Sequence, residues 1–189
     1  IAHFKRIGVD TIEVMPLMAW ADERHLAPLG LSNGWGYNPY CFGAPEPRLV
    51  PGGWVEIRDT LARLHAEGLQ VILDVVYNHT AETDANGPHL SWRGLDDASW
   101  YRHPADRPGA YENHTGCGNT LATDDPAVIA MILQSMRLWA GAGFDGFRYD
   151  LATVMGRGIS GFSADAPLLR AIQADARLGP LIHIAEPWD

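Results

Sequence analysis

The chain has 189 residues, of which 47% are hydrophobic and 20% are charged, so it can bury a core and is neither disordered nor fibrous in composition. Its formal net charge is −9 and it carries no basic tract, which argues against nucleic acid and anionic membranes as partners. No apolar run approaches the roughly 20 residues of a membrane-spanning helix.

One pattern recurs along the chain: a helical stretch, a glycine, a short β-rich run, and polar or proline residues where the run ends. This order is typical of βα units around a parallel sheet, with the glycines at its lower edge. The four runs are residues 11–15, 71–76, 143–149 and 181–185, introduced by Gly8, Gly68, Gly143 and Gly179.

Three amphipathic helices are predicted between these runs. In the second, Asp125 is expected as the N-cap and Pro126 as the first helical residue, and the helix should reach about residue 140. The third should follow Asp165. Apolar residues at helical spacing, which we interpret as core positions, are Trp54, Ile57, Leu61 and Leu64, then Val128, Ile132, Met136 and Trp139, then Leu168, Leu169 and Ile172.

The connections after the first two runs, residues 16–53 and 80–124, are far longer than the usual length of about 2–6 residues. Both follow the carboxyl ends of strands, where long loops are often functional. They are rich in Trp, Tyr, His, Gly and Pro. This composition suits stacking on sugar rings, and it equally suits an irregular insertion that is stabilised by burial.

Paired carboxylates end the last two runs. Arg148 and Asp150 are two residues apart and should project to the same side of the third run, while Glu186 follows the fourth run. Neighbouring strands lie about 4.8 Å apart, and retaining glycosidases need two carboxyl groups about 5–5.5 Å apart. A salt bridge at the sheet edge and a loop-bracing glutamate are the structural alternatives.

The two carboxyl groups have different expected roles. Arg148 should lower the pKa of Asp150 and keep it ionised as a nucleophile. The pKa of Glu186 should be raised by the apolar residues around it, Ala185, Pro187 and Trp188, as a general acid requires.

A further polar group, Asp74, Asn78 and His79, ends the second run and suggests hydroxyl recognition or a metal. A catalytic zinc site would need another ligand that the sequence does not place, so we predict no metal and no cofactor.

These segments together resemble the α-amylase clan of glycoside hydrolases, family 13. Residues 8–16, 74–79 and 146–150, with Glu186, match in order the clan's signatures on its second to fifth strands. The resemblance implies an α/β fold, a partial TIM (β/α)₈ barrel with strands two to five. Barrel parts 1–79 and 125–189 would flank an irregular insertion, residues 80–124, in the place of the clan's B domain.

The same resemblance implies roles for individual residues. Asp150 would be the nucleophile, Glu186 the acid/base, and Arg148 the residue that orients the nucleophile. His79 would contact the sugar, Tyr37 would stack on it, and Asp74 would brace the site. Further expected substrate-binding residues are Trp35, Asn78 and Trp188.

Segments 35–39, 116–120, 165–175 and 185–189 are most similar to bacterial glycogen debranching enzymes of the isoamylase type. This implies a cytoplasmic hydrolase that cleaves α-1,6 branch linkages of glycogen or limit dextrin with retention. Three alternatives stay open: a transferase of the clan such as a glycogen branching enzyme, a noncatalytic glucan-binding relative, and a metal-dependent barrel hydrolase.

The chain begins at Ile1 without methionine or signal peptide and ends at Asp189, directly after the fourth run. We therefore expect a fragment. The clan's third carboxylate would lie beyond it with the remaining barrel and flanking domains, so the fragment alone should be inactive, with exposed apolar strand edges. Cys41 and Cys117 should be free, buried thiols, as in a reducing cytoplasm.

Overall fold

The main sheet has four parallel strands in the order β1–β4–β5–β8. The protein is represented by a computed structural model that describes residues 1–187. Trp188, for which a substrate contact was expected, lies outside the described residues together with Asp189. The strands are β1 (Thr11–Val14), β4 (Gln70–Val75), β5 (Gly146–Tyr149) and β8 (Ile182–Ala185). Each predicted run overlaps one of them, with β4 starting one residue before its run, and the α/β class with a parallel sheet is confirmed.

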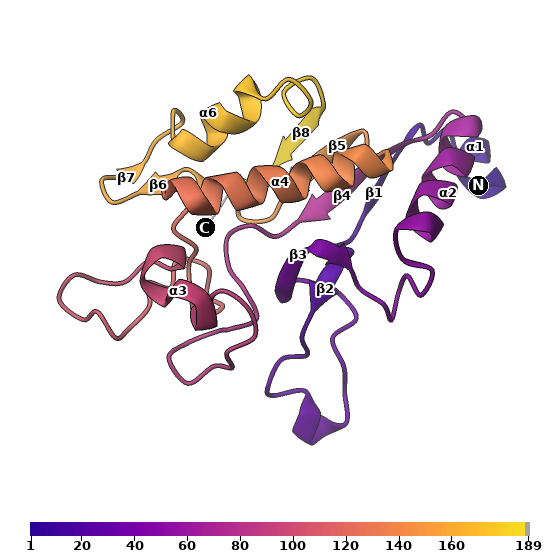
Figure 1. Ribbon diagram of the computed structural model, residues 1–189. Coiled ribbons are helices and arrows are strands. Elements are labelled where there is room, and N and C mark those ends of the chain that lie inside the picture. Colours follow the sequence, from indigo (N-terminus) through magenta and orange to yellow (C-terminus); the bar gives the residue numbers. More distant parts are fainter. Residues whose placement is uncertain (188–189) are drawn as a thin grey trace.

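Three helices pack on one face of this sheet (Figure 1): α2 (Gly53–Ala66), α4 (Pro126–Ala142) and α6 (Pro167–Ala174). Helix α4 lies between the other two and contacts both. The predicted cap of α4 is present, because the Asp125 side chain accepts a hydrogen bond of 2.7 Å from the Ala127 main-chain nitrogen. Helix α6 follows Asp165 as expected, with Ala166 as its N-cap and Pro167 as its first residue. A short helix, α1 (Ala2–Arg6), precedes β1.

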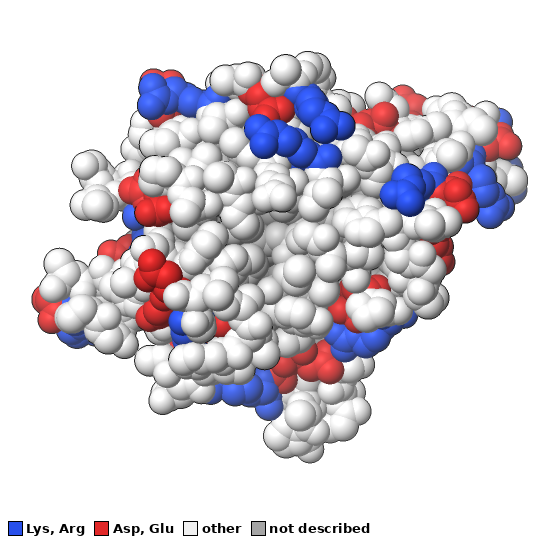
Figure 2. Space-filling view, viewed as in Figure 1, with Lys and Arg blue, Asp and Glu red and all other residues white. Residues whose placement is uncertain are grey.

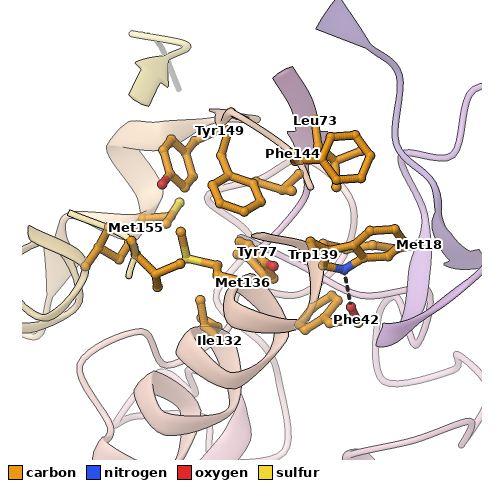
Figure 3. Close-up of a cluster of buried hydrophobic side chains, with 14 of the residues drawn as sticks. Met18, Phe42, Leu73, Tyr77, Ile132, Met136, Trp139, Phe144, Tyr149 and Met155 are labelled. Atoms are coloured by element: carbon orange, nitrogen blue, oxygen red, sulfur yellow. Dashed lines mark hydrogen bonds between the residues drawn. The ribbon is translucent and has the colours of Figure 1, made fainter. Parts of the chain in front are cut away.

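The hydrophobic core fills the space between sheet and helices (Figure 3). Alternate residues of the strands, such as Leu73 and Phe147, point into it and are fully buried. Trp139 on α4 lies at its centre, and its indole nitrogen donates to the Phe42 carbonyl oxygen at 2.8 Å. That bond satisfies the polar atom of a buried tryptophan and joins α4 to the segment that contains Phe42.

The first long connection is more ordered than the sequence predicted. It contains an antiparallel hairpin of β2 (Met18–Trp20) and β3 (Pro39–Pro45), with a short 3-10 helix, η1 (Ala27–Leu29), between them. The pairing is irregular, with register shifts on both sides of Ala19. A three-residue strand with a shifting register leaves no period-2 pattern to recognise, which explains why sequence patterning misses it.

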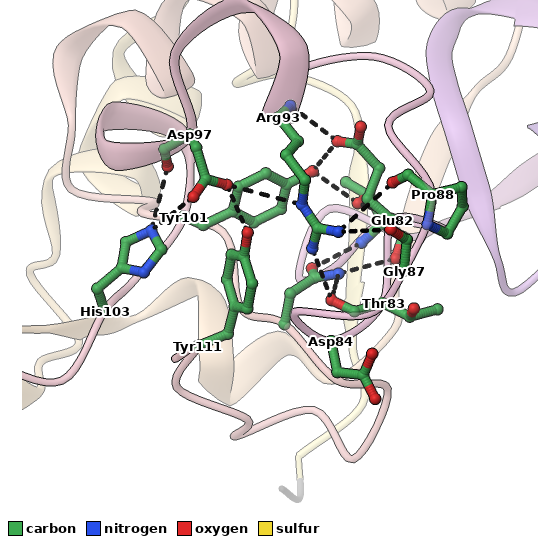
Figure 4. A network of polar contacts seen from close by, with 12 residues as sticks. Glu82, Thr83, Asp84, Gly87, Pro88, Arg93, Asp97, Tyr101, His103 and Tyr111 are labelled. Atoms are coloured by element: carbon green, nitrogen blue, oxygen red, sulfur yellow. Dashed lines mark hydrogen bonds and ion pairs between the residues drawn. The ribbon is translucent and has the colours of Figure 1, made fainter. Parts of the chain in front are cut away.

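The second long connection carries helix α3 (Arg93–Trp100) and is organised by a buried carboxylate (Figure 4). Glu82 accepts hydrogen bonds from the main-chain nitrogens of Leu90, Ser91 and Arg93, and from the Tyr101 hydroxyl. The Arg93 guanidinium donates to nearby carbonyl oxygens and lies 4.6 Å from the centre of the Tyr111 ring. A buried charge needs such partners, so polar contacts hold this insertion together.

After β5 the chain forms α5 (Ala152–Met155) and a small hairpin of β6 (Arg157–Gly158) and β7 (Gly161–Phe162) before α6. The edge strands of the main sheet expose apolar side chains, among them Ile184, which is 40% exposed. On the face shown in Figure 2, charged side chains of both signs lie mainly around the margin.

The two cysteines differ from the expectation in their exposure. Both cysteines are free, but the expectation that they are buried is wrong, because Cys117 is exposed and Cys41 is half-buried.

Within residues 1–187, no helix combines the length and apolar character that crossing a bilayer requires.

Candidate active site

The register of the sheet places Asp150 beside Glu186. The last paired residues of β5 and β8 are Tyr149 and Ala185, and each carboxylate is the next residue in its chain. The ladder continues for one step, because the Asp150 nitrogen donates to the Val75 oxygen at 3.0 Å and the Glu186 nitrogen to the Tyr149 oxygen at 3.1 Å. Both carboxyl groups therefore leave the carboxyl end of the sheet from fixed backbone positions.

The Arg148 guanidinium contacts three carboxylates. Its Nη1 donates to both oxygens of Asp74, at 3.1 and 3.0 Å, and lies 3.6 Å from Asp150 Oδ1. Its Nη2 lies 2.8 Å from Glu186 Oε1. The planar donor array of arginine suits several such contacts at once. With all groups ionised, one cation faces three anions, so negative charge is in excess.

Burial has a larger effect than the charge of Arg148 on the pKa values of Asp150 and Asp74. The pKa of Asp150 is raised by burial and by Glu186, although a hydrogen bond from Asn78 and the charge of Arg148 act to lower it. The expectation that Arg148 would set a low pKa for Asp150 is therefore wrong in its net direction. Burial likewise raises the pKa of Asp74 to about 6, against the hydrogen bonds from Tyr37 and Arg148.

The backbone turns sharply after Asp150. Leu151 has φ of +44°, in the left-handed region that side chains other than glycine rarely adopt. In this conformation its N–H donates to Glu186 Oε2 at 2.8 Å. The sequence did not reveal this contact of the Leu151 N–H with Glu186, since no residue preference signals a strained leucine at this place.

Tyr37 and Trp35 lie on the segment between η1 and β3. The Tyr37 hydroxyl donates to Asp74 Oδ2 at 2.5 Å, and burial together with this bond raises the pKa of the hydroxyl. Trp35 projects outward and is 71% exposed. Tyr37 is therefore joined to the carboxylate cluster, whereas Trp35 has a ring free for contact.

Asn78 and His79 are both buried at the end of β4. The Asn78 amide nitrogen lies 2.7 Å from the Asp150 carbonyl oxygen and 2.7 Å from Asp150 Oδ2. The His79 ring has Nδ1 at 2.5 Å from Asn78 Oδ1 and Nε2 at 3.0 Å from the Tyr37 carbonyl oxygen. Burial lowers the pKa of His79 to about 4. A sugar hydroxyl can bond a ring nitrogen only by displacing one of these partners.

An open groove of about 790 Å³ lies next to Tyr37, between the β2–β3 connection and the insertion. Its walls include His25, Tyr111 and Cys117. A second, mostly apolar cavity of about 610 Å³ adjoins Glu186 and is lined by residues of α6 and β8. Among residues 1–187, no three His, Cys, Asp or Glu side chains gather in a way that could hold a metal ion.

The chain is similar in sequence, over its full length, to segments of known proteins. The "Glycogen debranching enzyme" of Klebsiella pneumoniae (strain 342) is 46% identical over 193 residues, which cover 100% of this chain and 29% of the relative. The protein of the same name from Serratia proteamaculans (strain 568) is 45% identical over 197 residues, with the same shares covered. The chain thus spans less than a third of the length of these curated relatives.

Solved structures give the same result. Pullulanase from Paenibacillus barengoltzii, in complex with maltohexaose and alpha-cyclodextrin, matches 100% of this chain and 28% of its own, with a TM-score of 0.79 and 26% identity. Type I pullulanase from Bacillus subtilis str. 168, complexed with maltose, matches with a TM-score of 0.78 and 29% identity, over 100% of this chain and 25% of its own. No protein-family model matches the chain.

These relatives and the pullulanase structures confirm the resemblance to the α-amylase clan of glycoside hydrolases that was drawn from the sequence. Within that clan, the chain is homologous from end to end to a segment of the bacterial glycogen debranching enzymes.

Proposed function

We propose that the chain is part of the catalytic domain of a hydrolase that cleaves α-1,6 branch linkages of glycogen or limit dextrin. The observation that carries this proposal is the placement of Asp150 and Glu186 on neighbouring strand ends, both in contact with Arg148. A retaining glycosidase uses a pair of carboxyl groups, and here two lie side by side at one edge of a parallel sheet. The debranching specificity is supported by the names of the relatives.

The reaction would proceed by double displacement. Glu186 donates its proton to the glycosidic oxygen while Asp150 attacks the anomeric carbon, so the glycosidic bond breaks and a glycosyl ester of Asp150 forms. Glu186, now ionised, then takes a proton from water, whose oxygen attacks the same carbon and releases Asp150. Arg148, which faces both carboxyl groups, would orient Asp150 and offset the charge that moves between them.

The four strands would be strands two to five of a (β/α)₈ barrel, with residues 80–124 as the insertion after the third barrel strand. Met15, directly after β1, and Ile182 and Ile184 on β8 are exposed, which supports this proposal, since further strands would cover them. In such a barrel the active site lies at the carboxyl ends of the strands, and Asp150 and Glu186 occupy that end here.

The glucan would bind in the groove beside Tyr37. Tyr37, Trp35 and Trp188 would offer their rings to sugar faces, and His79 and Asn78 would offer polar groups, with Asp74 as the brace for Tyr37 and Arg148. The maltooligosaccharides held by pullulanase structures support a glucan of this kind. A glycogen substrate would place the protein in the cytoplasm.

The test uses the full-length parent of this chain with β-limit dextrin and linear amylose as paired substrates. Release of short linear chains from the dextrin, little activity on amylose, and loss of activity in both Asp150→Asn and Glu186→Gln are expected. New α-1,6 linkages without net hydrolysis would instead identify a transferase. Retained glycogen binding without turnover in the parent would identify a noncatalytic relative.

A further inference from the structure

We infer that Asn78 is a positioning residue for the nucleophile, and that His79 in turn fixes the orientation of the Asn78 amide. This inference rests on the proposed role of Asp150. It gives Asn78 a function through Asp150 in addition to any contact with sugar.

The Asn78 side chain is fully buried and reaches from the end of β4 to the end of β5. Its amide nitrogen lies 2.7 Å from two oxygens of the same residue, the carbonyl oxygen and Oδ2 of Asp150. Both oxygens are acceptors, so both hydrogens of the amide are used on Asp150. One side chain thus fixes both the main chain and the carboxylate rotation of Asp150.

This arrangement also determines the direction of the amide and the tautomer of the histidine. With its nitrogen toward Asp150, Asn78 presents Oδ1 to His79 Nδ1, 2.5 Å away. Because Oδ1 only accepts, Nδ1 must carry a proton. His79 Nε2 lies 3.0 Å from the Tyr37 carbonyl oxygen. Contacts therefore run from the Tyr37 main chain through His79 and Asn78 to Asp150.

The position of this contact matters because Asp150 precedes the left-handed turn at Leu151. The Asp150 carbonyl belongs to the peptide unit that leads into this turn, and Asn78 holds it. During the reaction the Asp150 carboxylate loses its charge when the ester forms and regains it when the ester is hydrolysed. A donor fixed on Oδ2 favours the ionised form at the start and the end of this cycle.

Removing the donor should therefore change the titration of Asp150. Its hydrogen bond from Asn78 acts to lower the pKa of Asp150, so loss of the amide raises that pKa, and the acidic limb of kcat/KM moves to higher pH. The other titratable groups that face Asp150 are Arg148, Glu186, Asp74, Tyr37 and Cys117, with His79 behind Asn78. None of these residues is substituted in the two Asn78 variants below.

The experiment compares Asn78→Ala and the isosteric Asn78→Asp in the full-length parent, with β-limit dextrin as substrate. Asn78→Ala should lower kcat about 10- to 100-fold, the range set by a hydrogen bond to a charged group, with little change in KM. Its acidic limb should move up by about one pH unit. Asn78→Asp places a carboxylate against Asp150 and should move the limb further.

Asn119→Ala is the matched control. Asn119 is equally buried, but its amide holds the main chain of Thr80 and Thr83. Its loss should lower the melting temperature without moving the acidic limb. An unmoved limb in both Asn78 variants would overturn the inference, provided that Asp150→Asn is inactive. Full activity of Asp150→Asn would instead overturn the proposed function on which the inference rests.

Discussion

Arg148 lies closer to Asp74 than to the proposed nucleophile. Its Nη1 is 3.0 Å from Asp74 Oδ2 and 3.6 Å from Asp150 Oδ1. Asp74 and Arg148 are also register partners on β4 and β5, so their side chains leave the sheet on the same side. Asp74 therefore holds Nη1 of the guanidinium, while Glu186 Oε1 lies 2.8 Å from Nη2. Arg148 reaches Asp150 from that position.

Replacing Asp74 should impair catalysis without touching the catalytic pair. In Asp74→Asn, Arg148 Nη1 loses the carboxylate that accepts from it through both oxygens, so the guanidinium can move toward Asp150. A misplacement of about 1 Å near the reacting atoms can cost about 100-fold in rate. We expect a loss of that order in kcat. Tyr37→Phe is the comparison, because it removes the hydroxyl that donates to Asp74 and leaves the charge of the Asp74 carboxylate in place. An Asp74→Asn enzyme with the kcat of the parent would contradict this account.

Asp74 and His79 should give opposite pH dependences of stability. The pKa of His79 falls from 6.5 to about 4 on folding, so its contribution rises with pH across that window. The pKa of Asp74 rises from 3.8 to about 6, so its contribution falls as pH rises through that window. Each is worth about 3 kcal/mol at most, and the two nearly cancel between about pH 4 and 6.

Variants separate the two contributions. Relative to the parent, Asp74→Asn should gain unfolding free energy as pH rises from about 4 to 6.5, whereas His79→Gln should lose it. Urea unfolding at several pH values across this window measures both. Identical pH slopes in the parent and both variants would show that neither group titrates as described.

The insertion should depend on the Glu82 carboxylate. Glu82→Gln turns an acceptor-only group into one with an amide nitrogen, which would face N–H and O–H donors. Each hydrogen bond to a charged group that is lost costs about 1.5–3 kcal/mol. Hydrogen exchange should show the loss of protection concentrated in residues 80–124. Glu112→Gln, whose contact with His114 is at the surface, should change stability by less than about 0.5 kcal/mol.

The parts of the fold that repeat a simple pattern could be predicted from the sequence. Strands β4 and β5 are short apolar runs that begin near glycines, and α4 has an aspartate cap followed by proline. The carboxylate pair follows from strand ends alone, because residues at equivalent positions on adjacent parallel strands must be neighbours. For these elements, local preference and tertiary structure agree.

Other features depend on contacts between residues far apart in the chain. A glutamate in a polar loop has the sequence signature of a solvated side chain, yet Glu82 is fully buried with donors from residues 90–101. The net direction of the Asp150 pKa shift depends on burial that no local pattern reports. The left-handed Leu151 is likewise imposed by its surroundings.

The most direct test of the account is to trap the glycosyl-enzyme. An activated fluorinated α-glucosyl fluoride is incubated with the full-length parent and with Glu186→Gln, and the peptides are analysed by mass spectrometry. The account predicts one glycosylated peptide, with the ester on Asp150, and no labelling of Asp150→Asn. A label on another residue, or product of inverted anomeric configuration with no ester formed, would contradict the assignment of Asp150 as the nucleophile.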